Sequence, residues 1–322
     1  MANHETASPQ NSAEEPLLKV NHLSIAFGTK HHRFEAVNDV SFSINRGETF
    51  GLVGESGSGK TTIGRAIIRI CPTSGGEVIY KGTQINGKIS RKLDKSLTQQ
   101  IQMIFQDPMS SLNERAKVDY IVSEGIRSNG YNVSKEEREK AVADALLDVG
   151  LLPEFSSRFP HEFSGGQRQR IGIARALIMK PDFIIADEPI SALDVSIRAQ
   201  VLNLLAELQK KRKLTYLFIA HDLSVMRFIT DRIAVIHLGR LVELAPTTTL
   251  FEHPMHPYTQ ALLSAIPLPN PQAEREKKLL VYDRSQHDYS SDPPSWIELE
   301  PGHFILANKQ EEQNYRNILA KI

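Results

Sequence analysis

The chain has 322 residues, of which 40% are hydrophobic and 24% charged, as is ordinary for a globular protein. Lysine plus arginine and aspartate plus glutamate number 38 each, so the formal net charge is zero and predicts no general attraction to nucleic acid or anionic lipid. The single cysteine, Cys71, excludes an internal disulfide and an all-cysteine metal site, and we expect it to be a small buried hydrophobe.

Residues 1–16 are polar and lack the apolar core segment of a signal peptide, so we expect a disordered leader there. The longest apolar runs, such as residues 217–220, are far too short to span a bilayer. If the protein works at a membrane, it therefore has to dock onto something that lies in the membrane.

Three early segments predict an antiparallel sheet. Residues 17–26 and 77–81 have the composition of strands, and Val40, Phe42 and Ile44 alternate with polar residues. Such alternation is typical of a sheet with one buried and one exposed face.

Later apolar runs are nearly continuous, which is the pattern of strands buried on both faces of a parallel sheet. These runs are residues 49–53, 101–105, 183–186 and 216–220. Helical periodicity lies between them, in residues 135–150 and 197–208. The sequence therefore predicts a wound α/β core.

Each of these predicted parallel strands is followed at once by a polar or glycine residue. These residues are Gly54, Gln106, Asp187 and His221. In open α/β sheets, ligands bind in the crevice outside the carboxyl ends of the strands. We therefore expect these remote positions to meet at one site.

The first of these segments matches the phosphate-binding loop pattern. The predicted ATP-binding residues are Gly54, Glu55, Ser56, Gly57, Ser58, Gly59, Lys60, Thr61 and Thr62. Its glycines let several backbone N–H groups aim at one phosphate, and the predicted helix over residues 62–70 adds its N-terminal dipole. Lys60 supplies a positive charge for the β- and γ-phosphates, and Thr61 a hydroxyl for Mg²⁺.

A second nucleotide motif is predicted where an apolar strand ends in Asp187 and Glu188. Asp187 would reach Mg²⁺, directly or through water, and Glu188 would orient or deprotonate the attacking water. His221 could donate a hydrogen bond to the γ-phosphate and sense the nucleotide state.

Ser164 is a good helix N-cap, and the helix that it begins is expected to run through Lys180. Two glycines follow the cap directly. This helix N-terminus is a second candidate for phosphate contacts.

Together these motifs closely resemble those of ABC transporter ATPase subunits, over roughly residues 17–270. The resemblance implies a P-loop NTPase fold with a parallel core sheet, an antiparallel β subdomain and a helical subdomain. It also implies that Ser164, Gly165, Gly166 and Gln167 contact ATP on a partner's phosphate loop. Small departures are Phe163, where leucine is usual, and Ile190, where threonine is common.

The same resemblance assigns roles to three further residues. Gln106 would be the Q-loop glutamine that links Mg²⁺ and water to the membrane subunits, and Asp194 would belong to the D-loop between the two sites. Phe27 stands where the family places an aromatic ring on adenine, although it could instead be a strand core residue.

The segments 158–163, 253–263 and 293–304 are similar to those of the peptide-importer branch, and most of all to the F-type ATPase subunit of bacterial oligopeptide importers. Such a subunit pairs with a distinct D-type ATPase, two transmembrane permease subunits and, indirectly, an external peptide-binding protein. Some relatives carry an iron–sulfur cluster, which one cysteine cannot hold.

We therefore expect an ATP- and Mg²⁺-dependent motor for oligopeptide import, without nucleic-acid partners, on the cytoplasmic face of the bacterial cell membrane. Dipeptides, nickel or antimicrobial peptides remain open as cargo, and a catalytically silent nucleotide-binding scaffold is the alternative role. A soluble ABC protein acting on DNA or ribosomes is disfavoured, since the chain has neither a long coiled-coil insertion nor a second cassette.

The expected domains are an ATPase domain over residues 17–250, with a helical subdomain at about 107–180, and an extension over residues 251–322. Because the extension is rich in proline, we expect it to lie over the main domain or a partner without a core of its own. The sequence assigns no role to Trp296, its only tryptophan.

Overall fold

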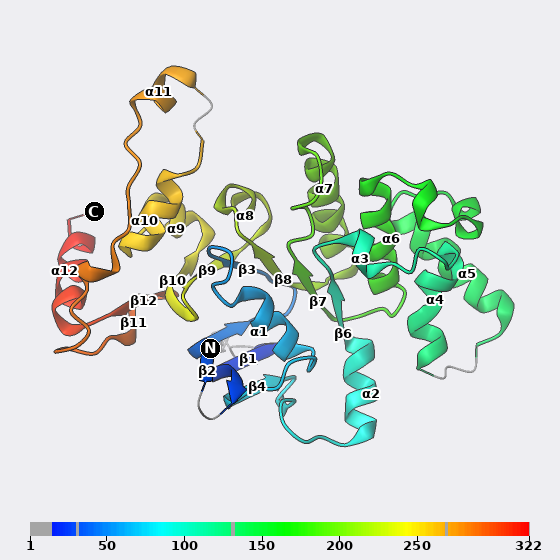
Figure 1. Ribbon diagram of the computed structural model, residues 1–322, viewed down its shortest axis with the longest axis horizontal. Coiled ribbons are helices and arrows are strands. Elements are labelled where there is room, and N and C mark those ends of the chain that lie inside the picture. Colours follow the sequence, from blue (N-terminus) through cyan, green and yellow to red (C-terminus); the bar gives the residue numbers. More distant parts are fainter. Residues whose placement is uncertain (1–14, 30–31, 130–132, 268–269, 322) are drawn as a thin grey trace, which may run out of the picture.

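A computed structural model of the protein describes residues 15–29, 32–129, 133–267 and 270–321. The expected leader lies outside these residues, apart from Glu15 and Pro16. In Figure 1 a broad central sheet separates a helical lobe on the right from the C-terminal extension on the left. The antiparallel strands lie below it.

The smaller sheet is antiparallel, as predicted, with the order β2-β1-β4-β5. Its strands are β1 (Leu18–Thr29), β2 (His32–Ile44), β4 (Gly75–Tyr80) and β5 (Thr83–Gln84). The predicted alternation is confirmed, because Val40, Phe42 and Ile44 are all buried. The Phe42 ring stacks on Phe50 at 5.1 Å and so joins this sheet to the central one.

The central sheet has eight strands in the order β11-β12-β10-β9-β3-β8-β7-β6. The predicted parallel strands are confirmed as β3 (Thr49–Val53), β6 (Ile101–Ile104), β7 (Phe183–Asp187) and β8 (Thr215–Ala220). The sequence analysis missed four others: β9 (Arg232–His237), β10 (Arg240–Pro246), β11 (Ser295–Glu300) and β12 (His303–Ala307). Only β9 of these is parallel to β3, and β10, β12 and β11 continue the sheet antiparallel.

Helices lie between the strands, as predicted, but their ends differ from the expected ones: some end earlier, whereas the helix expected over residues 197–208 continues to Arg212. Those beside the central sheet are α1 (Lys60–Ile67), α2 (Arg91–Gln100), α7 (Val195–Arg212) and α8 (Leu223–Ile229). Helix α1 stops before the predicted residue 70, because the backbone turns left-handed at Arg69, with φ of 66°.

The helical lobe is confirmed between β6 and β7. It contains α3 (Pro108–Ser111), α4 (Val118–Ser128), α5 (Lys135–Asp148), α6 (Gly165–Leu177) and the short 3₁₀ helices η1 (Pro153–Ser157) and η2 (Pro160–Glu162). Helix α6 begins at the predicted cap but ends three residues short of Lys180, where the backbone is left-handed with φ of 50°.

The C-terminal extension contains α9 (Thr247–Glu252), α10 (Pro257–Ser264), α11 (Pro271–Glu276), η3 (Arg284–Gln286) and α12 (Lys309–Leu319), besides β11 and β12. The expectation that it lacks a core is wrong. Its own small cluster consists of Met255, Leu299, Ile305, Ala307 and Tyr315. Trp296 stacks on Phe304, with ring centroids 6.1 Å apart, and so has a structural role at the sheet edge.

A buried carboxylate ties this extension to the sheet. Glu243 of β10 is 0% exposed and accepts hydrogen bonds from the Met255 and His256 backbone N–H groups, at 2.8 and 3.0 Å. The Nε2 atom of His303, on β12, lies 2.8 Å from the same carboxylate. One side chain thus joins β10 to two segments of the extension.

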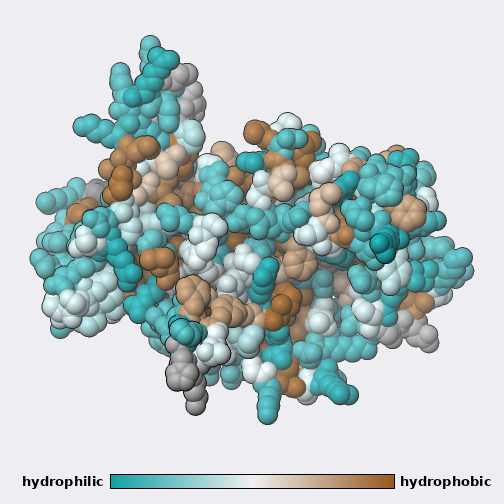
Figure 2. Space-filling view, in the orientation of Figure 1, coloured by the Kyte–Doolittle hydropathy of each residue, from teal (hydrophilic) through white to brown (hydrophobic). Residues whose placement is uncertain are grey.

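Within the residues that the structure describes, no helix is both long and apolar enough to cross a membrane. The face in Figure 2 is largely hydrophilic, with hydrophobic side chains in separate patches.

Replacing Glu243 by alanine is expected to lower the free energy of unfolding by about 2–4 kcal/mol, because two buried N–H groups lose their acceptor. Urea denaturation measures the change, and hydrogen exchange would locate it in residues 295–319. Glu300→Ala, at an exposed position on β11, is the control. Equal stability of the two variants would contradict this role of Glu243.

Candidate functional site

The predicted phosphate loop connects β3 to α1 and requires glycine at two positions. Gly59 has φ of 104°, and a Cβ atom there would lie 2.6 Å from the Ala36 carbonyl oxygen. A Cβ atom at Gly54 would lie 2.1 Å from the carbonyl oxygen of Ile236. The tight curve of the loop therefore depends on residues without side chains.

Lys60 lies under this loop and is only 4% exposed. Its Nζ atom donates to the carbonyl oxygens of Gly54 and Glu55, each at 2.7 Å. Burial lowers the pKa of Lys60, while the charges of Glu188 and Asp187 act to raise it. The ammonium group is thus held inside the curve of the loop.

Thr61 and Asp187 meet across the end of the sheet. The Thr61 hydroxyl donates to Asp187 Oδ1 at 2.8 Å, and Asp187 is 2% exposed. Burial raises the pKa of Asp187, which the hydrogen bond from Thr61 partly opposes. A hydroxyl and a carboxylate are the hard oxygen ligands that Mg²⁺ prefers, so these residues could hold that ion.

One oxygen of the Glu188 carboxylate has two hydrogen-bonding neighbours. Gln106 Nε2 donates to Glu188 Oε2 at 3.1 Å, and His221 Nδ1 lies 3.0 Å from the same atom. The Glu188 backbone is left-handed, with φ of 45°, and its N–H donates to Ile219 O at 2.9 Å. Such a conformation is strained in a residue other than glycine and is common at functional sites. The structure thus brings together the predicted Gln106, Glu188 and His221.

One cleft, with a volume of about 610 Å³, is lined by the predicted residues Ser56, Gly57, Gly59, Lys60, Thr61, Thr62, Gln106, Glu188 and His221. Gly54, Glu55, Ser58 and Asp187 are not among its lining residues. Phe27 forms one wall of it, and Phe34, which the sequence analysis missed, lies on the same wall. The two rings belong to a cross-strand pair of β1 and β2 and are 44% and 65% exposed. Large aromatic side chains with so much exposure are available to stack on a ligand.

The predicted residues 164–167 and Asp194 do not line this cleft. Ser164 caps α6 and accepts a hydrogen bond from the Gln167 N–H at 3.4 Å, and the Gln167 side chain bonds back to the Ser164 N–H. Ser164, Gly165 and Asp194 are exposed. This helix N-terminus is therefore preformed but lies outside the cleft of its own chain.

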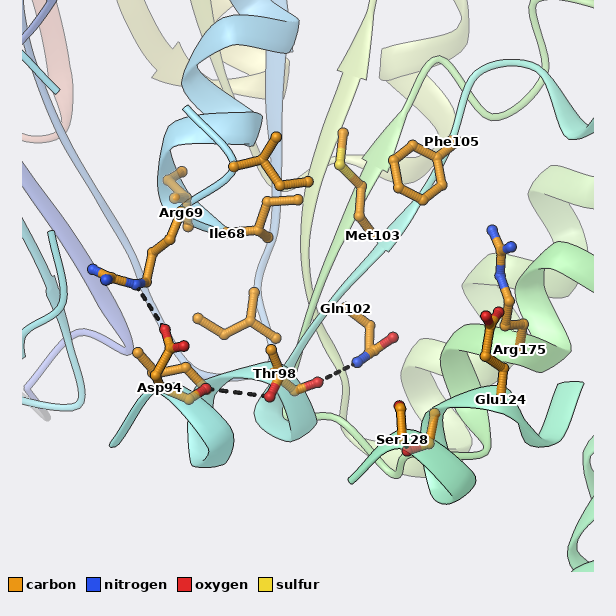
Figure 3. Close-up of a pocket in the computed structure, with 15 residues that line it drawn as sticks. Ile68, Arg69, Asp94, Thr98, Gln102, Met103, Phe105, Glu124, Ser128 and Arg175 are labelled. Carbon is orange, nitrogen blue, oxygen red and sulfur yellow. Dashed lines mark hydrogen bonds and ion pairs between the residues drawn. The ribbon is translucent and has the colours of Figure 1, made fainter. Parts of the chain in front are cut away.

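A second groove begins one residue before Gln106, between the helical lobe and the core. Figure 3 shows Ile68, Met103 and Phe105 on its core side and Glu124, Ser128 and Arg175 on its lobe side. The Arg175 guanidinium lies 5.8 Å from the Phe105 ring centroid and donates to Ser111 O at 2.6 Å. Because Phe105 and Gln106 are consecutive, this groove and the cleft share one backbone segment.

Asp187→Asn is expected to stabilise the chain without nucleotide or metal at pH 7, because burial opposes a charge on the carboxylate and the amide carries none. A raised pKa means that the folded state favours the protonated carboxyl group. Its contribution to stability is therefore present at acid pH and is lost as the pH rises through the folded-state pKa. The advantage of the variant should therefore shrink between pH 7 and pH 4. Urea denaturation at both values measures it, with the exposed Asp194→Asn as control. A variant less stable than the parent at pH 7 would contradict this reasoning.

Comparison with known proteins identifies the family. The ABC transporter model matches residues 37–191, and the model of the oligopeptide/dipeptide transporter C-terminal region matches residues 242–290. The oligopeptide transport ATP-binding protein AmiF of Streptococcus pneumoniae is 61% identical, over 94% of this chain and 98% of the relative. OppF of Streptococcus pyogenes, of the same description, is 59% identical over 95% and 99%.

Among solved structures, the ATP-binding cassette MJ0796 is similar, with a TM-score of 0.65 and 28% identity over 71% of this chain and 98% of that one. It is described as a dimer in a post-hydrolysis state bound to ADP and Pi. The sequence relationship extends over nearly the whole chain, and the fold agrees with it. The chain belongs to the ABC transporter family, as an ATP-binding and ATP-hydrolysing subunit.

Proposed function

We propose that this chain is the F-type motor subunit of an oligopeptide importer and that the cleft at residues 54–62 is its ATP site. The observation that carries the proposal is the Glu188 carboxylate, held by Gln106 and His221 beside the curved loop and Lys60. The oligopeptide cargo is supported by the descriptions of AmiF and OppF and by the match of residues 242–290.

In this proposal the backbone N–H groups of residues 54–62 hold the ATP phosphates, and Lys60 moves from the loop carbonyls to the β- and γ-phosphates. The adenine ring stacks on Phe27, with Phe34 beside it. Thr61, Gln106 and Asp187 would hold Mg²⁺, which neutralises phosphate charge when bound.

Glu188 then acts on water. Its carboxylate orients the attacking water and accepts a proton, while the new bond forms from water oxygen to the γ-phosphorus and the bond to the bridging oxygen breaks. Gln106 and His221 keep the carboxylate directed at the γ-phosphate. The strained Glu188 backbone supports this orientation.

Residues 164–167 and Asp194 lie outside the cleft, and Ser164, Gly165 and Asp194 are exposed, which suits contact with a second nucleotide-binding subunit. We propose that Ser164, Gly165, Gly166 and Gln167 contact ATP on the phosphate loop of a D-type partner, with Asp194 between the two sites. The dimeric form of the similar cassette MJ0796 supports such a pairing. Each ATP would then be enclosed by both subunits, so that hydrolysis changes their contact.

The groove beside Gln106 suits contact with the membrane subunits. It presents apolar side chains such as Ile68 and Phe105 between the charged Asp94 and Glu124, a combination that accommodates a short amphipathic helix. We propose that one of two permease subunits docks here and the other on the D-type partner, on the cytoplasmic face of a bacterial membrane, and that an external peptide-binding protein delivers the cargo.

Dipeptide import is the second candidate, because the family that matches residues 242–290 includes both transporter types. Uptake assays with dipeptides and with longer peptides distinguish the two cargoes.

Glu188→Gln is expected to lower the ATPase rate by about 10²–10⁴-fold, because the amide cannot accept the proton from water. The variant should still bind Mg·ATP, and peptide uptake by cells should fall with the ATPase rate. Glu207→Gln, at an exposed position on α7, is the matched control. Unchanged hydrolysis by Glu188→Gln would refute the catalytic assignment.

Glu124→Lys is expected to reduce recovery of the permease subunits with this chain, since it reverses a charge at the exposed lip of the groove. Quantitative pull-down from membranes measures the recovery, and Mg·ATP binding should remain unchanged. Asp144→Lys, an exposed reversal on α5, serves as the control. Equal recovery for both variants would argue against this groove as the contact.

A further inference from the structure

The peptide groups on either side of Glu55, the second residue of the phosphate loop, are held from opposite directions. Its carbonyl oxygen accepts a hydrogen bond from Lys60 Nζ at 2.7 Å. Its backbone N–H donates to the hydroxyl oxygen of Tyr258 at 3.2 Å. The two residues are 203 positions apart, so this is a tertiary contact between the loop and the C-terminal extension.

Tyr258 has little freedom to leave this contact. It is 1% exposed, and its ring lies 4.2 Å from the His237 ring and 5.3 Å from Tyr282, measured between centroids. The His256 side chain caps α10 by accepting from the Tyr258 N–H at 3.1 Å, and the His256 N–H is held by the buried Glu243. The hydroxyl is therefore presented to Glu55 from a fixed base.

The protonation state of the tyrosine suits an acceptor role. Burial raises the pKa of Tyr258 to about 12, so the hydroxyl is neutral at pH 7. A neutral hydroxyl has two lone pairs, and the backbone N–H needs only one of them.

The tyrosine that contacts the loop comes from the C-terminal part of the chain. Tyr258 lies in residues 242–290, the region that matches the transporter C-terminal family, and outside the 37–191 match to the general ABC family. Helix α10 lies beside β10 in Figure 1. A neighbouring contact comes from the turn between β9 and β10, where the Gly239 N–H donates to Ser58 O at 3.0 Å. Helix α10 and the turn between β9 and β10 thus both form hydrogen bonds with the loop.

We propose that Tyr258 is a positioning residue for ATP: it fixes the Glu55 peptide group, and so preserves the curve of the loop while Lys60 exchanges loop carbonyls for phosphate oxygens. The inference rests on the proposed assignment of residues 54–61 as the phosphate loop. Because linkage is reciprocal, nucleotide that orders the loop also stabilises the position of α10. The extension and the ATP site are thereby energetically coupled.

Tyr258→Phe in the full chain tests this, since it removes the hydroxyl and keeps the ring. Titration with Mg²⁺ and a methylanthraniloyl ATP analogue should give a Kd about 3–10-fold higher, as for loss of one hydrogen bond. In the assembled transporter, KM for ATP should rise similarly, while kcat stays within about twofold. Hydrogen exchange in residues 256–264 should slow when nucleotide binds to the parent chain, and less so in the variant.

Tyr282→Phe is the matched control, because it makes the same change on a neighbouring ring whose hydroxyl has no hydrogen-bond partner among the described residues. Its Kd should equal that of the parent. A Kd for Tyr258→Phe within twofold of the parent, or an equal loss for Tyr282→Phe, would overturn the inference. Undiminished binding of Mg·ATP by Lys60→Ala would instead contradict the assignment of the phosphate loop. The two variants thus distinguish failure of the Tyr258 inference from failure of the proposed ATP site.

Discussion

The candidate site depends on the register of parallel strands β3, β8 and β7. Val53 pairs with Ala220, and Asp187 pairs with Ile219 on the other side of β8. The chain therefore leaves neighbouring strands at the same edge, where the phosphate loop, Glu188 and His221 begin. Because side chains alternate between faces, a slip of one residue would turn the Asp187 carboxylate away from Thr61.

Burial also opposes charge at the site. It lowers the pKa of Lys60 and raises that of Asp187. Glu188 adds a strained backbone. These features destabilise the chain without ligand, but they leave the Asp187 and Glu188 carboxylates already oriented. The buried apolar strands of the central sheet compensate for this local loss of stability.

The C-terminal extension is joined to the phosphate loop through the central sheet. The sheet continues from β3 through β9 and β10 to β12 and β11, so the phosphate loop and the extension share one hydrogen-bonded layer. Glu243 holds the start of α10, and Tyr258 of that helix reaches the loop. The groove beside Gln106 adjoins the same cleft from the side of the helical lobe. The cleft is therefore linked both to the C-terminal extension and to the groove beside the helical lobe.

The sequence by itself determined the phosphate loop, the Asp187–Glu188 pair, the capped helix at Ser164 and the family, because each of these depends on residues that are close together in the chain. It also located the parallel strands, whose continuous apolar runs reflect burial on both faces. Only the tertiary structure decided that Phe34 joins Phe27, that β9–β12 extend the sheet and that Tyr258 holds the loop. These features arise from strand pairing and packing between distant segments, and no local pattern encodes which remote partner a side chain meets.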